Sequence, residues 1–315
     1  MTRVFGVIGD PIAHSLSPVI QNGWLRDHGI DGEYLAMHVP KDSLGESLES
    51  LARRGISGLN VTLPHKQGAL DACGSLTDRA EAIGSVNTLW RPGDGEWHGD
   101  NTDAPGFNYA FNLALDTAPS DQTNRPVLVI GAGGAALAVA YDLGKNACPA
   151  IFCNRTVARA ERLIEVYDRA RGTKELDPAK RSARPLSELP DALEEAYVVI
   201  NATSLGHAGQ SIDSWPNGRG RLVYDLSYGN AAKTFLGPAA IADWVTVDGL
   251  WMLVAQAAYA FEIWFGVLPD IKAGHARAQK VLEAENNHAT ASRTFCARAC
   301  PVFISGRTPN HISKA

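Results

Sequence analysis

The chain has 315 residues and carries 29 Lys and Arg against 34 Asp and Glu, a formal net charge of −5 at pH 7. This balance lacks the basic excess of nucleic-acid-binding proteins, and no apolar run reaches the roughly 18 residues that a membrane span needs. Residues 1–11 lack the pattern of a secretion signal. Five scattered cysteines are too few, and odd in number, for a disulfide framework. We therefore expect a cytoplasmic protein of about two domains that binds neither nucleic acid nor membrane.

The first hundred residues alternate between strand-like and helix-like segments. Short β-branched apolar runs that end at turn residues predict strands, and apolar residues at helical spacing predict helices. Ser17 as N-cap and Pro18 in the first helical position begin the first helix. The predicted strands cover residues 4–8, 33–39 and 58–62, a second helix covers 41–54, and a hairpin joins 85–91 to 96–99.

Residues 116–125 are polar and contain a proline, which predicts a linker before a second series of strands and helices. Strand, helix, strand and helix then follow in order, and this alternation is typical of a parallel, doubly wound sheet. The predicted strands are 126–130, 150–153, 196–200 and 221–226, and the predicted helices are 134–146, 157–171, 249–265 and 270–285.

Residues 286–315 differ from the rest because they contain no acidic residue and show no clear periodicity. They predict a poorly packed extension. Cys296, Cys300 and His311 lie within it, but three such residues fall short of a convincing metal-ligand set. We therefore predict no metal site.

A glycine-rich turn directly follows the predicted strand 126–130 and opens a helix. Gly131, Gly133 and Ala136 match the G-x-G-x-x-G/A pattern of dinucleotide binding in its required strand-to-helix context. The first glycine permits the tight turn, the second lets the backbone approach a pyrophosphate, and the helix N-terminus presents free N–H groups to phosphate. The alternative is a glycine-lined turn that serves packing alone.

The end of the next strand indicates which dinucleotide is bound. NAD-binding folds usually carry an acidic residue there for the ribose 2′-hydroxyl, whereas this chain has Asn154, Arg155 and Thr156, with Arg159 one turn further. A guanidinium suits a phosphate group, so the pattern favours NADP over NAD. A solvated surface arginine is the other interpretation of Arg155.

Three polar patches in the first hundred residues point to a small anionic substrate with several hydroxyls. Two serines, Ser15 and Ser17, stand near a helix start. Asn60 and Thr62 share one face of a strand and precede Lys66. Asn87 and the segment 99–103 stand at predicted strand ends. Each patch alone fits turn-forming or solvated residues, but together they favour a polyhydroxylated acid, with Asp103 beside Lys66 as a polar pair.

These motifs together resemble those of the shikimate dehydrogenase family over almost all of residues 3–285. The resemblance implies two α/β domains with a cleft between them: a discontinuous substrate domain of 1–104 and 250–285, and an NADP-binding Rossmann-like domain of 105–249. It implies reversible NADPH-dependent reduction of 3-dehydroshikimate to shikimate in aromatic amino-acid biosynthesis, with Lys66 and Asp103 as the catalytic pair. A homodimer is left open.

The resemblance also implies the binding residues. The substrate would contact Ser15, Ser17, Asn60, Thr62, Asn87, Asp103, Tyr228 and Gln256. The cofactor would contact Gly131, Ala132, Gly133, Gly134, Ala135, Asn154, Arg155, Thr156, Arg159, Thr203, Gly249 and Met252.

Some residues depart from the family's pattern. Trp251 stands where glycine is frequent, so its indole either reshapes the cleft or points into the core. Ala104 and Pro105 follow Asp103 where glycine is usual, and Leu137 replaces a frequent arginine. Two alternatives stay open: a quinate or related hydroxy-ring-acid dehydrogenase, and a non-catalytic ligand sensor, which the presence of both Lys66 and Asp103 disfavours.

Overall fold

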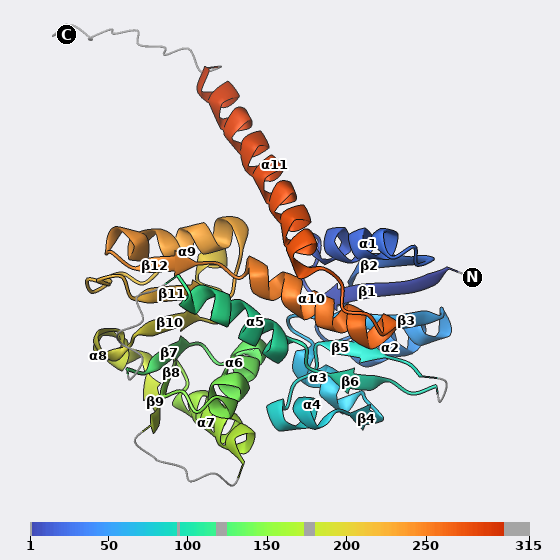
Figure 1. The fold of residues 1–315 in the computed structure, drawn as a ribbon, viewed down its shortest axis with the longest axis horizontal. Helices are drawn as coiled ribbons and strands as arrows, with labels where there is room; N and C mark the ends of the chain where they lie inside the picture. Colours follow the sequence, from blue (N-terminus) through green and yellow to red (C-terminus); the bar gives the residue numbers. More distant parts are fainter. Residues whose placement is uncertain (1, 93–94, 118–124, 173–179, 299–315) are drawn as a thin grey trace, which may run out of the picture. The chain divides into compact units, whose positions relative to one another are not determined.

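The computed structural model describes residues 2–92, 95–117, 125–172 and 180–298, with side chains as far as Glu285. Residues Met1–Ala278 form one compact unit that holds two six-stranded sheets. Helix α11 (Ile271–Arg298) continues into a second unit, Gln279–Ala315. The two units are described separately, and both sheets belong to the first (Figure 1).

The first sheet is mixed, with strand order β2-β1-β3-β5-β6-β4. Strand β1 pairs in parallel with β2 and β3, whereas β3, β5 and β6 form antiparallel pairs, as the predicted hairpin requires. Its strands are β1 (Arg3–Gly9), β2 (Gly32–His38), β3 (Ile56–Val61), β4 (Ser75–Leu76), β5 (Thr88–Trp90) and β6 (His98–Asp100). The helices between them are α1 (Ser17–Asp27), α2 (Leu44–Arg53), α3 (Lys66–Asp71) and α4 (Asp78–Ile83).

The second sheet is parallel throughout, with strand order β12-β11-β10-β7-β8-β9. Read from β9, this is the 3-2-1-4-5-6 order of a Rossmann-type sheet, so the predicted fold class is confirmed. Its strands are β7 (Val127–Ile130), β8 (Ala150–Asn154), β9 (Arg181–Pro185), β10 (Val198–Asn201), β11 (Leu222–Asp225) and β12 (Val245–Val247). Around it run α5 (Asp103–Leu115), α6 (Gly134–Lys145), α7 (Val157–Arg171), α8 (Leu189–Glu195) and α9 (Gly229–Ile241), with single 3₁₀ turns at Leu186–Glu188 and Gly206–Ala208.

Strand β7 shows why the sequences of the central strands are continuous apolar runs. Val127 and Val129 face one hydrophobic core, while Leu128 and Ile130 face the core on the other side of the sheet. Alternate side chains point to opposite faces of a strand, so a strand covered on both faces needs an apolar residue at every position. All four residues are buried.

Helix α10 (Leu250–Phe265) follows the second sheet and contacts α5 and α1. Gln21 donates from Nε2 to the carbonyl of Ala257 at 2.9 Å, and Trp264 donates from Nε1 to the carbonyl of Leu89 at 3.1 Å. Helix α10 therefore contacts elements of the first sheet's half of the chain. The domain boundaries 1–104 with 250–285, and 105–249, stay predictions.

Several elements differ from the sequence prediction. Ser17 is not an N-cap: it is the first residue of α1, Leu16 takes the cap position, and no side chain caps that helix. Helix α2 begins at Leu44 rather than residue 41. Helix α11 runs to Arg298 instead of ending at residue 285, so the first part of the predicted extension is helical. Elements without a prediction are α3, β4, α4, α5, β9, α8, α9 and β12.

Some expectations fall on residues outside the described ranges. These are most of the linker 116–125, the extension beyond Arg298, and the Cys300 and His311 of the rejected metal set. Within the described part of the chain, no group of three or more His, Cys, Asp or Glu could hold a metal ion. No helix in the same residues is long and apolar enough to span a membrane.

Candidate active site

The predicted pair of Lys66 and Asp103 forms a direct contact. Each is the first residue of a helix, Lys66 of α3 and Asp103 of α5. Lys66 donates from Nζ to Oδ2 of Asp103 at 2.5 Å, and their side chains are 16% and 6% exposed. The ion pair is thus largely withdrawn from water, and a pair of this kind keeps a strong mutual attraction.

Asn87 joins this pair to helix α10. Its Nδ2 donates to Oδ1 of Asp103 at 2.9 Å and to Oε1 of Gln256 at 3.3 Å. Its Oδ1 accepts from the backbone N–H of Thr102 at 2.7 Å, which fixes the orientation of the carboxamide. Three residues that the sequence places far apart therefore meet, and both carboxylate oxygens of Asp103 have a donor.

Asn60 extends the network along strand β3. Its Nδ2 donates to the carbonyl of Asn87 at 3.3 Å and to the hydroxyl of Thr88 at 3.2 Å. Its Oδ1 accepts from the hydroxyl of Tyr34 at 2.7 Å. Asn60 is 4% exposed, so each of these bonds matters because an unpartnered amide would be costly to bury.

The two predicted serines lie at the start of α1. The backbone N–H of Ser17 donates to Oγ of Ser15 at 3.3 Å, and the Ser17 side chain is buried. Because no side chain caps α1, the Ser17 hydroxyl is not committed to the helix end. Thr62 follows strand β3 and is half-buried. Tyr228 stands apart from these in the chain, between β11 and α9, and is also half-buried.

The glycine loop lies at the carboxyl ends of β7 and β10, where the strand order of the second sheet reverses direction. Gly131 has φ +102°, and a Cβ there would lie 2.8 Å from the carbonyl oxygen of Ala202 and 2.9 Å from Cγ2 of Thr203. Only glycine fits both the angle and the space. Gly133 is exposed, and a Cβ there would meet nothing within 4 Å. A ligand phosphate therefore has open access to the N-terminus of α6.

The end of β8 presents its polar residues to solvent. Arg155, Thr156 and Arg159 are exposed, and the Thr156 hydroxyl does not cap α7. Asn154 donates from Nδ2 to the carbonyl of Thr156 at 2.9 Å, which shapes the turn. Two cations and a hydroxyl are available at the position where a Rossmann-type fold binds the adenosine ribose.

The lysine also reaches the glycine loop. A Cβ on Gly134 would lie 3.1 Å from Cδ of Lys66 and 3.5 Å from Oγ of Ser85. The polar cluster on the first sheet and the loop on the second sheet are therefore neighbours. Gly249 lies against the carbonyl of Leu226, which a Cβ would meet at 2.2 Å, and Met252 is buried on α10.

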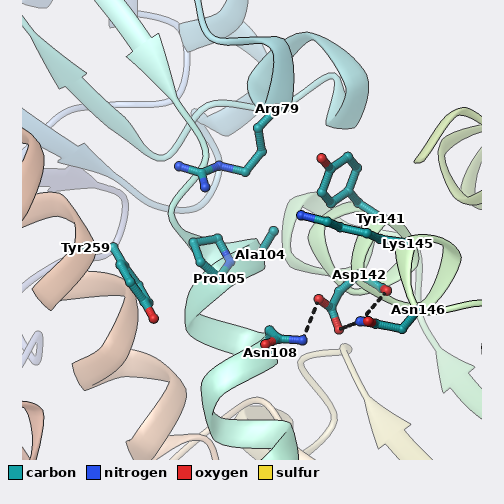
Figure 2. A pocket seen from close by; sticks show the side chains of 9 residues that line it. All are labelled: Arg79, Ala104, Pro105, Asn108, Tyr141, Asp142, Lys145, Asn146 and Tyr259. Atoms are coloured by element: carbon teal, nitrogen blue, oxygen red, sulfur yellow. Dashed lines mark hydrogen bonds between the residues drawn. The ribbon is translucent and has the colours of Figure 1, made fainter. Parts of the chain in front are cut away.

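A separate pocket of about 230 Å³ lies among α4, α5, α6 and α10 and contains none of the predicted site residues (Figure 2). Asp142 lies on its wall, where it accepts hydrogen bonds from Nδ2 of Asn108 at 3.0 Å and of Asn146 at 3.2 Å. Burial raises the pKa of Asp142 from 3.8 to about 6. The other lining residues are Arg79, Ala104, Pro105, Tyr141, Lys145 and Tyr259.

Comparison with known proteins agrees with this geometry. Three family models match the chain: the shikimate dehydrogenase substrate binding domain at residues 7–89, shikimate / quinate 5-dehydrogenase at 112–209, and the shikimate 5′-dehydrogenase C-terminal domain at 249–279. A shikimate dehydrogenase (NADP(+)) of Hyphomonas neptunium is 46% identical over 90% of this chain and 99% of its own length. The chain belongs to the shikimate dehydrogenase family.

Solved structures are similar in fold to this family member. The shikimate 5-dehydrogenase of Thermus thermophilus, in complex with NADP(H) and shikimate, has a TM-score of 0.73 and 33% identity, and the match covers 88% of this chain and 99% of that one. The quinate dehydrogenase of Corynebacterium glutamicum, in complex with NAD, has a TM-score of 0.76 and 25% identity over 89% and 99%. The fold alone therefore does not separate the two activities.

The residues that depart from the family pattern have structural explanations. Trp251 stacks on His275 of α11, with ring centroids 3.7 Å apart and an interplanar angle of 10°, and its ring lies 6.3 Å from that of Tyr109. The indole thus packs against neighbouring helices. Leu137 lies on α6, and its side chain is buried in the core. Asn101 accepts from the backbone N–H of Ala104 at 3.3 Å, which supports the first turn of α5.

Sequence reasoning about this shikimate dehydrogenase family member missed Tyr34. The residue lies on β2, two strands away from Asn60, and it belongs to none of the polar patches that the sequence singles out. Aromatic residues are common in strands, where they usually pack in the hydrophobic core. Only the pairing of β1 with both β2 and β3 reveals that its hydroxyl reaches a site residue.

Proposed function

We propose that this protein catalyses the reversible, NADPH-dependent reduction of 3-dehydroshikimate to shikimate, a reaction of aromatic amino-acid biosynthesis. The observation that carries the proposal is the buried Lys66–Asp103 pair, oriented by Asn87 and adjacent to the glycine loop at Gly134. Membership of the shikimate dehydrogenase family supports it. A non-catalytic sensor would have no need of this pair.

The residues present fit NADP. The open approach at Gly133 and the tight turn at Gly131 would provide a cradle for a pyrophosphate, which Ala132, Gly134 and Ala135 would complete. Arg155, Arg159, Thr156 and Asn154 would hold the 2′-phosphate, since no acidic residue follows β8 to repel it. Thr203, Gly249 and Met252 would border the nicotinamide side. When bound, NADPH supplies the hydride of the reduction.

Lys66 would act as the general acid of the reduction. Negative charge develops on the carbonyl oxygen of the substrate, and a protonated Nζ stabilises that charge and donates a proton to it. Asp103 holds Nζ in place through its Oδ2 atom, and Asn87 holds the carboxylate through Oδ1. In the reverse direction the same lysine, once deprotonated, removes the proton from the substrate hydroxyl.

The surrounding polar side chains would orient the substrate. Ser15, Ser17 and Tyr228, with Thr62 close by, would hold the carboxylate, and Asn60, Asn87, Asp103 and Gln256 would hold the ring hydroxyls. The hydrogen bonds from Asn87 to Asp103 and Gln256 arrange three of these groups before the substrate binds. Such preorganisation lowers the entropic cost of reaching the reactive geometry.

Quinate is the second candidate substrate. It carries an added hydroxyl at the carboxylate-bearing carbon, and a solved quinate dehydrogenase shares the fold at 25% identity. The residues after β8 favour NADP and so weigh against an NAD-linked quinate enzyme. The carboxylate pocket around Ser15 and Tyr228 would decide whether the extra hydroxyl fits.

A two-by-two comparison tests the proposal. The purified protein is assayed with shikimate and with quinate, each with NADP⁺ and with NAD⁺, and kcat/KM is measured for all four combinations. A Lys66→Ala variant purified from the same host shows how much activity comes from the host's own enzymes. We expect shikimate with NADP⁺ to give the highest kcat/KM. A dominant quinate and NAD⁺ activity would refute the proposal.

We further propose that the protein works in the cytoplasm. The three cysteines in the part of the chain with described side chains are free thiols, as a reducing compartment predicts. Fractionation of the source cells with an antibody would test this location. Whether the protein is a monomer or a homodimer is decided by sedimentation velocity of the purified chain.

A further inference from the structure

A buried tyrosine outside the predicted site holds one of the proposed substrate contacts. Tyr34 lies on β2 and is 1% exposed, and its hydroxyl donates to Oδ1 of Asn60 at 2.7 Å. The donor and acceptor lie on strands β2 and β3, which flank β1, so the tyrosine side chain reaches across the central strand. The proposed function gives Tyr34 no role.

The backbone and ring of Tyr34 are held on two further sides. Asn22 on α1 donates from Nδ2 to the Tyr34 carbonyl at 2.8 Å and accepts from the Tyr34 N–H at 2.9 Å. The Tyr34 ring lies 6.1 Å from the ring of Trp264 on α10. The hydroxyl therefore has a defined position, set by an edge strand and two helices.

The single proton of the Tyr34 hydroxyl makes the bond directional. Burial raises the pKa of Tyr34 well above its ordinary value of 10, while a side-chain hydrogen bond with Ser17 lowers it. The group is therefore a neutral phenol that donates to Asn60 and is contacted by Ser17. With Oδ1 of Asn60 turned toward Tyr34, its Nδ2 faces Thr88 and the carbonyl of Asn87.

We propose that Tyr34 is a positioning residue that selects one orientation of the Asn60 carboxamide and so prepares the site for the ring hydroxyls of the substrate. Without the Tyr34 hydroxyl, the buried Oδ1 of Asn60 loses its donor, and only the two longer bonds of Nδ2 oppose rotation of the amide. Loss of one buried hydrogen bond corresponds to roughly a tenfold change in an equilibrium constant. The proposal rests on the proposed function, since it deepens the account of the same site.

The test uses Tyr34→Phe, which removes only the hydroxyl. We expect the KM and the directly titrated dissociation constant for shikimate to rise on the order of tenfold, with kcat changed less than about twofold and the KM for NADP⁺ unchanged. The matched control is Tyr167→Phe, which removes the hydroxyl of a buried tyrosine on α7, beside the second sheet, that donates to the carbonyl of Cys148 at 2.8 Å. It should lower thermal stability without changing the KM for shikimate.

A second comparison asks whether Tyr34 acts through Asn60. In an Asn60→Ala background, Tyr34→Phe should add little to the KM, because two residues that act through one bond are not additive. Additive effects, or a Tyr34→Phe variant that loses stability yet binds shikimate as the wild type does, would overturn the proposal. If Tyr34→Phe does not fold, Asn22→Ala, which releases the Tyr34 backbone, should raise the same KM.

The two proposals fail in different ways. If the wild type oxidises quinate but not shikimate, the shikimate assignment is wrong. The Tyr34 measurements are then made with quinate, whose ring hydroxyls Asn60 would contact in the same way. If the wild type oxidises shikimate and Tyr34→Phe binds it unchanged, the proposed function stands and the role of Tyr34 is wrong.

Discussion

Lys66 and Asp103 are 37 positions apart in the chain, yet Nζ of the lysine lies 2.5 Å from Oδ2 of the aspartate. Each begins a helix, so neither side chain is constrained by a preceding helical turn. Asn87 donates a hydrogen bond from Nδ2 to the other carboxylate oxygen of Asp103, Oδ1, at 2.9 Å. The carboxylate therefore cannot rotate away from the lysine without breaking a second bond, which gives the lysine a defined direction.

Replacement of Lys66 tests its role as the proton donor. We expect Lys66→Ala to lower kcat by at least ~100-fold with little change in the KM for shikimate, because proton transfer is needed in the transition state more than in binding. Steady-state assays with shikimate and NADP⁺ measure both constants. The control is Lys41→Ala, an exposed lysine outside the site. Near-wild-type turnover of Lys66→Ala would remove Lys66 from the mechanism.

Replacement of Arg155 tests the choice of cofactor. Arg155 is exposed at the end of β8, where its guanidinium can meet a 2′-phosphate. Arg155→Ala should raise the KM for NADP⁺ on the order of tenfold and leave that for NAD⁺ nearly unchanged, since charge-assisted hydrogen bonds contribute about 1.5–3 kcal/mol. Arg53→Ala, at an exposed ion pair on α2, is the control. An unchanged ratio of the two KM values would contradict the assignment.

Substitution of Gly131 tests the glycine loop. Gly131→Ala places a Cβ 2.8 Å from the carbonyl oxygen of Ala202 at a φ of +102°. We expect a loss of about 1–3 kcal/mol in the free energy of unfolding, together with a higher KM for NADP⁺. Gly45→Ala on α2, where a Cβ would meet nothing within 4 Å, should leave stability unchanged or slightly higher. Urea unfolding measures the stability of both variants. Equal stabilities would refute the structural role of Gly131.

Asp142 predicts a pH dependence of stability. Its pKa in the folded protein is raised from 3.8 to about 6 by burial, so the folded state holds the proton more tightly than the unfolded chain does. The stability that protonation contributes is present at low pH and is lost as pH rises through about 6.

The pH prediction is measured by comparing Asp142→Asn with the wild type. Between pH 5 and pH 8 the wild type should lose about 1 kcal/mol more in the free energy of unfolding than the variant, because the variant lacks the Asp142 carboxyl. The substitution lies in the pocket of Figure 2, away from the Lys66 and Asp103 pair. If the free energy of unfolding varied with pH in the same way in the two proteins, burial would not raise the pKa of the Asp142 carboxyl.

Local patterns in the sequence predicted the strand, glycine turn and helix at 126–146, and the structure confirms this order of elements. Gly131 and Gly133 stand between an apolar strand and a helix, and this order of elements is visible within about twenty residues of chain. The elements that were missed, such as β9 and α8, are short or lack strong periodicity. The N-cap assignment of Ser17 was wrong because Ser-Pro fits both the cap and the first helical turn, and only the backbone distinguishes them.

The sequence by itself determined which chemical groups are available: the lysine and aspartate that we propose for proton transfer, the amides and hydroxyls that we propose for the substrate, and the arginine that we propose for the 2′-phosphate. Only the tertiary structure decided which of them meet. Asn87 and Gln256 are 169 positions apart, and Tyr34 reaches Asn60 across a third strand. The pattern of apolar residues sets each element separately, whereas contacts between distant side chains depend on how the sheets and helices pack together.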